Sequence, residues 1–244
     1  MTLLEVEGLH KSFGGLKAVN GATFGVEEGS ITALIGPNGA GKTTAFNMAS
    51  GVLRPDEGSI RLEGKEIVGL RPHKITARGV SRTFQITRGL SYLTVLENMV
   101  AAAPPQGIWG LFGSKIASKE TERAMELLEF VGIDHLADAE AQELSYGQRK
   151  LLEFAAALMP EPRLVLLDEP AGGVNPTLLE RIIDRIRTVR NTGVTFLIVE
   201  HNMDMVMKLS DSVVVMAHGA VLMQSDPATV QEDPRVLDAY LGKV

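Results

Sequence analysis

Residues 34–44 read LIGPNGAGKTT, and this stretch decides the fold of the chain. It places three glycines and a lysine between a short apolar run and a segment with a helical pattern. Its core matches Gly-x-x-x-x-Gly-Lys-Thr, a pattern that joins a strand to a helix around a bound phosphate chain. Glycines permit the backbone angles that point successive N–H groups at one anion, and the start of the helix adds partial positive charge. The stretch therefore predicts a phosphate-binding loop.

Each polar side chain of this loop has an expected role. We expect Lys42 to reach the β and γ phosphates, Thr43 to bind Mg²⁺ through its hydroxyl, and Thr44 to donate to the α phosphate. The alternative is a glycine-rich turn without a ligand, which the strand and helix on either side make less favourable. The candidate phosphate-binding residues are Gly36, Pro37, Asn38, Gly39, Ala40, Gly41, Lys42, Thr43 and Thr44.

Short apolar runs alternate with helical patterns on both sides of the loop. Several runs are continuously apolar, as in strands that are covered on both faces, and the alternation favours an α/β fold with a mostly parallel sheet. From about residue 94 to residue 159 only helical patterns occur, which predicts an all-helical insertion. The expected strands are 3–6, 31–35, 164–167, 194–199 and 213–216, and the expected helices are 43–49, 95–103, 119–131, 148–158, 177–190 and 202–209.

Composition excludes several classes of protein. The 244 residues are 45% hydrophobic, enough for a substantial core, and the net charge of -6 with no basic stripe argues against nucleic acid as a partner. The chain has no cysteine, which excludes disulfides, thiolate zinc sites and a cysteine nucleophile. We find no signal-type core at the start and no apolar stretch long enough to span a membrane, so work at a membrane would require a partner.

A second acidic site is expected at the end of another buried strand. In the run RLVLLDEP, Asp168 follows four apolar residues, and ligands collect at this carboxyl edge of an open α/β sheet. We expect Asp168 to bind the metal, directly or through water, and Glu169 to act as the general base for the attacking water. A turn or helix cap after a core strand is the alternative for an isolated acidic pair.

The segment LSYGQ, residues 144–148, separates the kinds of nucleotide hydrolase. It resembles the signature of ATP-binding cassette (ABC) ATPases, usually LSGGQ, with Tyr146 in place of the first glycine. Ser145 and the free N–H groups of the helix that follows would form an anion site with no phosphate of its own subunit to bind. In the family, two subunits pack head to tail, and Ser145, Tyr146, Gly147 and Gln148 would close on the ATP of the partner.

The resemblance covers nearly the whole chain and implies its architecture. We expect an α/β fold with a P-loop NTPase core, a mostly parallel sheet, an N-terminal antiparallel β subdomain and an all-helical insertion. Residues 1–244 would form a single ATP-binding domain. In it, 1–93 and 160–244 would make the core with its β subdomain, and 94–159 would make the helical signature subdomain.

The resemblance also assigns residues that would otherwise pass for surface or packing positions. Gln85 resembles the loop glutamine that touches metal and water, and His201 resembles the switch histidine on the γ phosphate. Phe13 resembles the aromatic that stacks on adenine, usually a tyrosine. Asn175 stands where the family often has an aspartate, in the loop that contacts the partner across the dimer.

Three stretches, RTFQ with TVLENMVAAA, DEPAGGVNP and DPRVLDAYLG, are similar to the ATP-binding subunits of branched-chain amino acid importers. This resemblance implies ATP and Mg²⁺ as cofactors and a dimer with an identical or related subunit. It also implies transmembrane permease subunits, an indirect link to a substrate-binding protein, and a cytoplasmic place on the inner face of the membrane. The loop with Trp109 and Phe112 is a candidate docking segment, or it covers the insertion's own core.

Other assignments stay open at this point. Within transporters, the alternative is the ATPase of an exporter or a lipid transporter, and outside them a soluble ABC ATPase of chromosome or repair work. A P-loop GTPase would need an Asn-Lys-x-Asp motif, which the sequence lacks. A non-catalytic regulatory module is disfavoured because both Glu169 and His201 are present.

Overall fold

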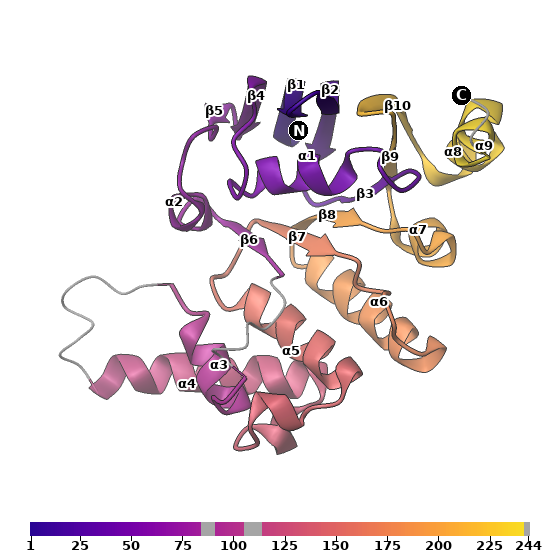
Figure 1. The fold of residues 1–244 in the computed structure, drawn as a ribbon. Coiled ribbons are helices and arrows are strands. Elements are labelled where there is room, and N and C mark those ends of the chain that lie inside the picture. The colour runs from indigo at the N-terminus through magenta and orange to yellow at the C-terminus, as the bar shows by residue number, and fades with distance from the viewer. Residues whose placement is uncertain (84–90, 105–113, 242–244) are drawn as a thin grey trace.

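The structure is a computed structural model that describes residues 1–83, 91–104 and 114–241, except for the side chains of residues 114–118. Figure 1 shows two sheets in the upper half of the molecule, with helix α1 between them, and helices α3, α4 and α5 gathered below. The N-terminal strands and the C-terminal helices lie at the same, upper end.

Six strands of the described residues form the larger sheet, in the order β10-β9-β3-β8-β7-β6. All neighbouring pairs are parallel except β9 and β10, which form an antiparallel hairpin. The mostly parallel sheet expected from the apolar runs is therefore confirmed. Its strands are β3 (Ile31–Ile35), β6 (Val80–Arg82), β7 (Leu164–Asp168), β8 (Thr195–Val199), β9 (Ser212–Ala217) and β10 (Ala220–Ser225).

A second, antiparallel sheet has the order β2-β1-β4-β5, which confirms the expected N-terminal β subdomain. The apolar run at residues 3–6 predicted only the beginning of its first strand, because the later residues of that strand are more polar and more exposed. The strands are β1 (Thr2–Phe13), β2 (Leu16–Glu27), β4 (Glu57–Leu62) and β5 (Lys65–Glu66).

The six expected helices are present, and the helices at Pro72–Thr76, Pro227–Glu232 and Pro234–Tyr240 were not expected. The helix expected at 95–103 ends at Ala101, and two others begin at least two residues earlier than expected. The fourth helix begins at Ser114 and not at residue 119, because SKIAS has one large apolar residue and gives no apolar period. The fifth begins at Tyr146 and not at residue 148, because Ser145 caps it. The helices are α1 (Lys42–Ala49), α2 (Pro72–Thr76), α3 (Val95–Ala101), α4 (Ser114–Val131), α5 (Tyr146–Leu158), α6 (Pro176–Arg190), α7 (Met203–Leu209), α8 (Pro227–Glu232) and α9 (Pro234–Tyr240), with 3-10 turns η2 (Asp134–Leu136) and η3 (Ala141–Glu143).

The larger sheet is buried on both faces, which explains its continuously apolar strands. In β7, Leu164 and Leu166 belong to the core shared with α1 and the antiparallel sheet. Val165 and Leu167, which alternate with them, belong to the core shared with α3, α4, α5 and α6. Because side chains of a strand point alternately to opposite faces, both sets must be apolar.

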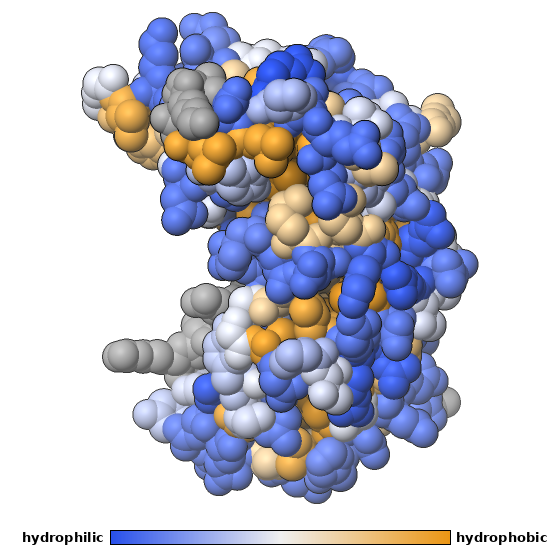
Figure 2. Space-filling view, turned by 90° about the vertical axis from the view of Figure 1, so that its right-hand side faces the viewer, coloured by the Kyte–Doolittle hydropathy of each residue, from blue (hydrophilic) through white to orange (hydrophobic). Residues whose placement is uncertain are grey.

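Figure 2 shows the side of the molecule that carries α7, α8 and α9. This face is mainly hydrophilic, and a hollow separates the upper lobe with the sheets from the lower lobe with the helical segment. In the part of the chain that the structure describes, no helix combines the length and the apolar composition needed to cross a lipid bilayer.

Candidate nucleotide-binding site

The phosphate loop connects the end of β3 to the start of α1, and packing explains its glycines. Gly36 has φ 144° and Gly41 has φ 96°, both outside the range that side chains favour. A Cβ atom on Gly36 would lie 2.1 Å from the backbone oxygen of Met216, and one on Gly41 would lie 2.4 Å from that of Ala18. The loop therefore fits against β2 and β9 only when both positions are glycine.

The open side of the loop presents unused hydrogen-bond donors. A Cβ atom on Gly39, at φ 81°, would meet nothing within 4 Å, so this face of the loop is free for a ligand. Among residues 36–44, all of which are described, no backbone hydrogen bond takes the N–H groups of Gly39, Gly41, Lys42 or Thr43. These four donors at the start of a helix form a cradle whose chemistry fits a phosphate chain.

Lys42 lies folded along the loop. Its Nζ donates to the carbonyl oxygens of Gly36 at 2.6 Å and Pro37 at 3.0 Å. Burial lowers the pKa of Lys42 below its ordinary value, and the charge of Glu169 raises it in part. A cation beside the cradle adds to the attraction for an anion, and a nearby carboxylate favours its charged form.

Asp168 and Glu169 stand at the carboxyl end of β7, as the sequence predicts. They line a cavity of about 500 Å³ together with Thr43, and this places the acidic strand beside the phosphate loop. Glu169 has φ 48°, and its N–H donates to Val199 O at 2.9 Å. The left-handed backbone directs the chain away from the sheet and leaves the Glu169 carboxylate exposed.

His201 follows β8, the neighbour of β7, so its imidazole reaches the same edge of the sheet. Its Nδ1 lies 3.6 Å from Oε1 of Glu169, and both side chains are exposed. The parallel register pairs Asp168 with Val199, two residues before His201. The candidate base and the candidate phosphate contact are thus adjacent although they are far apart in the sequence.

The donor set around Asp168 fits a magnesium ion. Thr43 offers a hydroxyl and Asp168 a carboxylate on the same cavity wall, and Mg²⁺ prefers such oxygen ligands together with substrate phosphates. Among the described residues there is no group of three or more His, Asp or Glu side chains that suits a metal ion. The third expected metal contact, Gln85, lies outside the described residues.

The signature residues lie around a different cavity. Ser145 caps α5 by accepting from Gln148 N at 3.3 Å, while Gln148 Oε1 accepts from Ser145 N at 2.8 Å. A cavity of about 610 Å³ is lined by Ser145, Tyr146, Gly147 and Gln148 together with residues of the η2 region and α6. Tyr146 lines this cavity and also the one beside Asp168. The serine that sequence analysis assigns to phosphate is thus also a structural cap.

The signature helix packs tightly on the loop after β7. A Cβ atom on Gly173 would lie 2.9 Å from Cε1 of Tyr146, and one on Gly147 would lie 2.4 Å from Cδ2 of Leu178 in α6. Asn175 caps α6 by accepting from Leu178 N at 2.9 Å. Asn175, which stands where an aspartate is common, therefore still caps the helix.

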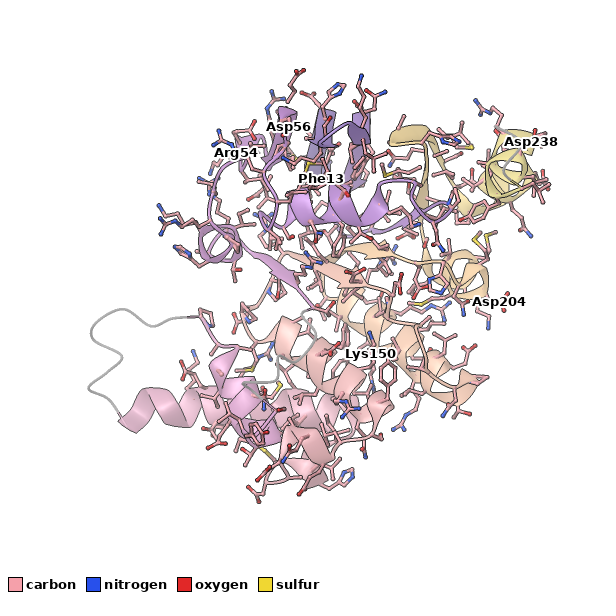
Figure 3. All side chains as sticks on the ribbon, in the orientation of Figure 1. Phe13, Arg54, Asp56, Lys150, Asp204 and Asp238 are labelled. Carbon is pink, nitrogen blue, oxygen red and sulfur yellow. The ribbon has the colours of Figure 1, made fainter. Side chains whose placement is uncertain are left out.

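Phe13 ends β1 as a residue that is 51% exposed, and the Nζ of Lys11 lies 5.8 Å from its ring centroid. Figure 3 shows Phe13 above the larger sheet and Lys150 below it. The exposed ring is accessible for stacking on a planar base. The loop residues Trp109 and Phe112 lie outside the described residues.

Two side-chain contacts around Asp168 and Glu169 were not predicted from the sequence. Arg82 donates to Asp168 Oδ2 at 3.2 Å, and Lys150 Nζ donates to the carbonyl oxygen of Glu169 at 3.4 Å. No local signal in the sequence indicates Arg82, because the three-residue strand that it ends has no apolar pattern.

Comparison with known proteins places this geometry in a family. The family described as "ABC transporter" matches residues 19–172. A probable branched-chain amino acid transport ATP-binding protein LivG of Archaeoglobus fulgidus is 45% identical in an alignment of 247 positions, which covers 99% of this chain and 96% of that protein. The high-affinity branched-chain amino acid transport ATP-binding protein BraF of Pseudomonas aeruginosa is 43% identical in an alignment of 252 positions, which covers 99% of this chain and 98% of that protein.

A solved structure is similar over the same length. The ADP conformation of MJ1267, an ATP-binding cassette of an ABC transporter, has a TM-score of 0.89 and 36% sequence identity. The match covers 99% of both chains. The fold and the sequence therefore lead to the same group of proteins.

Proposed function

This chain belongs to the ABC transporter family of ATPases, and from that premise we propose that it powers the import of branched-chain amino acids. The observation that carries the proposal is the match to branched-chain transport proteins at 45% and 43% identity over almost the entire length of each. Close relatives that share every part of the cassette provide stronger support than a shared fold, which hosts many functions.

Residues of the phosphate loop and of the ends of β7 and β8 have separate roles in ATP hydrolysis. Lys42 and the loop N–H groups bind the phosphates of ATP, and Phe13 stacks on the adenine. Glu169 orients and deprotonates the attacking water, and His201, 3.6 Å away, contacts the γ phosphate. Thr43, Asp168 and Gln85 hold Mg²⁺, which neutralises charge on the phosphates when it is bound.

Two separate anion sites in one chain favour a head-to-tail dimer. The phosphate loop lines one cavity with Thr43, whereas Ser145 and Gly147 line another. We infer that Ser145, Tyr146, Gly147 and Gln148 close on the ATP that a second ATP-binding subunit holds. Nucleotide then joins the two subunits, and hydrolysis releases them.

The partners follow from the proposed role. Transmembrane permease subunits provide the path for the solute and hold the ATPase against the inner face of the cell membrane. A substrate-binding protein delivers the solute from the other side. Residues 94–159, as the helical subdomain, carry the signature, and we infer that they move with the Gln85 loop when the permease changes state.

The catalytic assignment is tested by Glu169→Gln. We expect ATP binding to remain, turnover to fall by roughly 10²–10⁴-fold, and an ATP-bound dimer to accumulate. Steady-state hydrolysis and size-exclusion chromatography with ATP measure the two effects. Glu161→Gln is the matched control, since Glu161 is also an exposed glutamate at positive φ, 52°, and lies outside the catalytic cavity. Unchanged hydrolysis by Glu169→Gln would exclude Glu169 as the base.

The transport assignment needs the membrane partners. The chain is co-expressed with the permease genes that neighbour its own and reconstituted in liposomes with the matching binding protein. We expect ATP-dependent uptake of labelled leucine, isoleucine or valine, and no uptake with Glu169→Gln. Export of solute, or uptake of a different solute class only, would contradict the proposal while leaving the ATPase assignment intact.

A further inference from the structure

Glu200 is a buried carboxylate to which the hydrolysis mechanism assigns no step. It follows β8 directly and is 1% exposed. In the part of the chain that the structure describes, it is the only acidic or basic residue that is buried. An ionised carboxylate that is removed from water is strongly unfavourable unless hydrogen bonds compensate for the lost hydration. Its partners therefore indicate its role.

The two carboxylate oxygens of Glu200 serve two different segments. Oε1 accepts from the backbone N–H of Ala171 at 2.7 Å. Oε2 accepts from the N–H groups of His201 at 2.9 Å and Asn202 at 3.0 Å. Hydrogen bonds to an ionised acceptor are among the stronger ones in proteins, and three of them hold this side chain. One buried group thus joins the loop after β7 to the turn after β8.

Both segments carry residues of the proposed chemistry. Ala171 lies two residues after Glu169, and the N–H of Gly172 donates to the carbonyl oxygen of Glu169 at 3.0 Å. The other segment begins with His201 itself. Since Glu169 and His201 are both exposed, few packing contacts fix their separation of 3.6 Å. The bonds of Glu200 fix the backbone on each side of that gap.

We propose that Glu200 is a positioning residue that holds the loop at residues 171–175 and the His201 turn in one fixed relation. This inference rests on the proposed roles of Glu169 and His201. The same arrangement connects α5 to the edge of the sheet that carries Glu169 and His201, because Gly173 in this loop packs against Tyr146 at the start of α5. A shift of α5 reaches the turn of His201 through Ala171 and Glu200, a chain of direct contacts.

The substitution Glu200→Gln can separate the bond to Ala171 from the bonds to His201 and Asn202, because it replaces one carboxylate oxygen with an NH2 group. In Glu200→Gln, the amide keeps one acceptor oxygen and gains an NH2 group that cannot accept a hydrogen bond. The oxygen is expected to stay on His201 and Asn202, where it satisfies two donors. The NH2 group then faces the N–H of Ala171. The substitution should therefore release the loop at residues 171–175 and leave the His201 turn in place.

The experiment measures both segments in the nucleotide-free protein. By hydrogen–deuterium exchange, we expect the amide of Ala171 to exchange roughly tenfold faster or more in Glu200→Gln, and those of His201 and Asn202 to stay unchanged. In ATP assays, we expect the Kd for ATP to stay within about twofold and kcat to fall by roughly 10–100-fold, as for misplaced catalytic groups. A change in kcat without a change in binding distinguishes positioning from general loosening.

Thr195→Val is the matched control. Thr195 is fully buried at the opposite end of β8, and its hydroxyl accepts from Gly29 N at 2.9 Å. This substitution removes a partly buried hydrogen bond from the same strand, and we expect it to lower stability without changing kcat by more than about twofold. Glu200→Thr is a second variant, because its short side chain can still accept from nearby N–H groups but cannot reach Ala171.

Two results would overturn the proposal. One is an unchanged kcat in both Glu200 variants, and the other is equal loosening of the two segments in Glu200→Gln and Thr195→Val. Because the exchange measurement uses no nucleotide, it reports on Glu200 even if Glu169→Gln shows that the base lies elsewhere. Failure of the proposed function and failure of this inference are therefore separate outcomes.

Discussion

At the scale of single residues, Gly36 shows how backbone angle and packing exclude a side chain together. We expect Gly36→Ala to lower the free energy of unfolding by at least about 3 kcal/mol, since its Cβ would overlap Met216 O at 2.1 Å and its φ of 144° is strained. Gly64 is the control, because it has a φ of 70° but a Cβ atom there would meet nothing within 4 Å. Gly64→Ala should therefore show the cost of the backbone angle alone and lower the free energy of unfolding by about 1–2 kcal/mol. Urea unfolding compares the two, and equal losses would contradict the packing argument.

Arg82 connects three parts of the site through one guanidinium group. It donates to Asn47 Oδ1 at 2.6 Å, Ser50 Oγ at 2.9 Å and Asp168 Oδ2 at 3.2 Å, and it lies 4.6 Å from the ring centroid of Phe46. The side chain is 12% exposed. Burial lowers the pKa of Arg82, and Asp168 raises it in part. These contacts attach α1, β6 and β7 to one another at the Asp168 carboxylate.

We therefore expect Arg82→Met to lower the free energy of unfolding by about 2–4 kcal/mol, because it leaves three acceptors without this donor. Arg61→Met is the control, since the Arg61–Glu7 pair, at 2.9 Å, is on the surface and should contribute less than about 1 kcal/mol. Urea unfolding of both variants measures the difference. A loss for Arg82→Met no larger than for Arg61→Met would mean that the network contributes nothing to stability.

At the scale of helices and strands, local signals predicted the elements that form locally. The glycines of residues 36–41, the apolar residues of β7 and the acids at its end are adjacent in sequence, so their meaning can be read from spacing. The helical insertion was predicted in the same way from its periods. The short strand β6 gave no such signal, since its three residues include a serine and an arginine. Its place depends on pairing with β7, more than 80 residues away, as the pair Arg82↔Leu166 shows.

The contacts that sequence analysis missed are all between distant segments. Glu200 bonds to Ala171, Arg82 to Asp168 and Lys150 to Glu169, and no pattern of spacing relates such pairs. The parallel sheet creates them, because it brings the ends of strands from different parts of the chain to one edge. The candidate residues on that edge could be predicted one by one, and the bonds that position them could not.

Ser145, at the start of α5, caps the helix and is also proposed to bind the ATP of the partner subunit. A matched pair of variants can separate these two roles. Ser145 and Thr94 each form a capping box, with Gln148 and Glu97 respectively. Ser145→Arg and Thr94→Arg introduce the same charge and lose the same kind of cap, so each should cost about 1 kcal/mol of stability. Only Ser145→Arg should block ATP-driven dimerisation, because it fills the proposed site of the partner's phosphate, while ATP binding by the monomer remains. Size-exclusion chromatography in a Glu169→Gln background measures this, and normal dimerisation of Ser145→Arg would contradict the head-to-tail site.

At the scale of the whole molecule, the decisive property is the dependence of activity on protein concentration. One chain places Thr43 of its phosphate loop and Ser145 of its signature around different cavities, so we expect a single subunit to bind ATP and to hydrolyse it slowly. Below the dissociation constant of the dimer, the dimer fraction rises with concentration by mass action, and activity per milligram should rise in near proportion. Ser145→Arg should stay low at every concentration.

Hydrolysis measured over about a 100-fold range of concentration, with light scattering to follow mass, tests this expectation. A flat specific activity at the full rate, in samples that scatter as monomers throughout, would mean that Lys42, Asp168, Glu169 and His201 suffice within one chain. Ser145 would then be only the cap of α5. If activity and dimer mass rise together, the energy of ATP binding is available to bring two subunits together, which a permease between them requires for work on a solute.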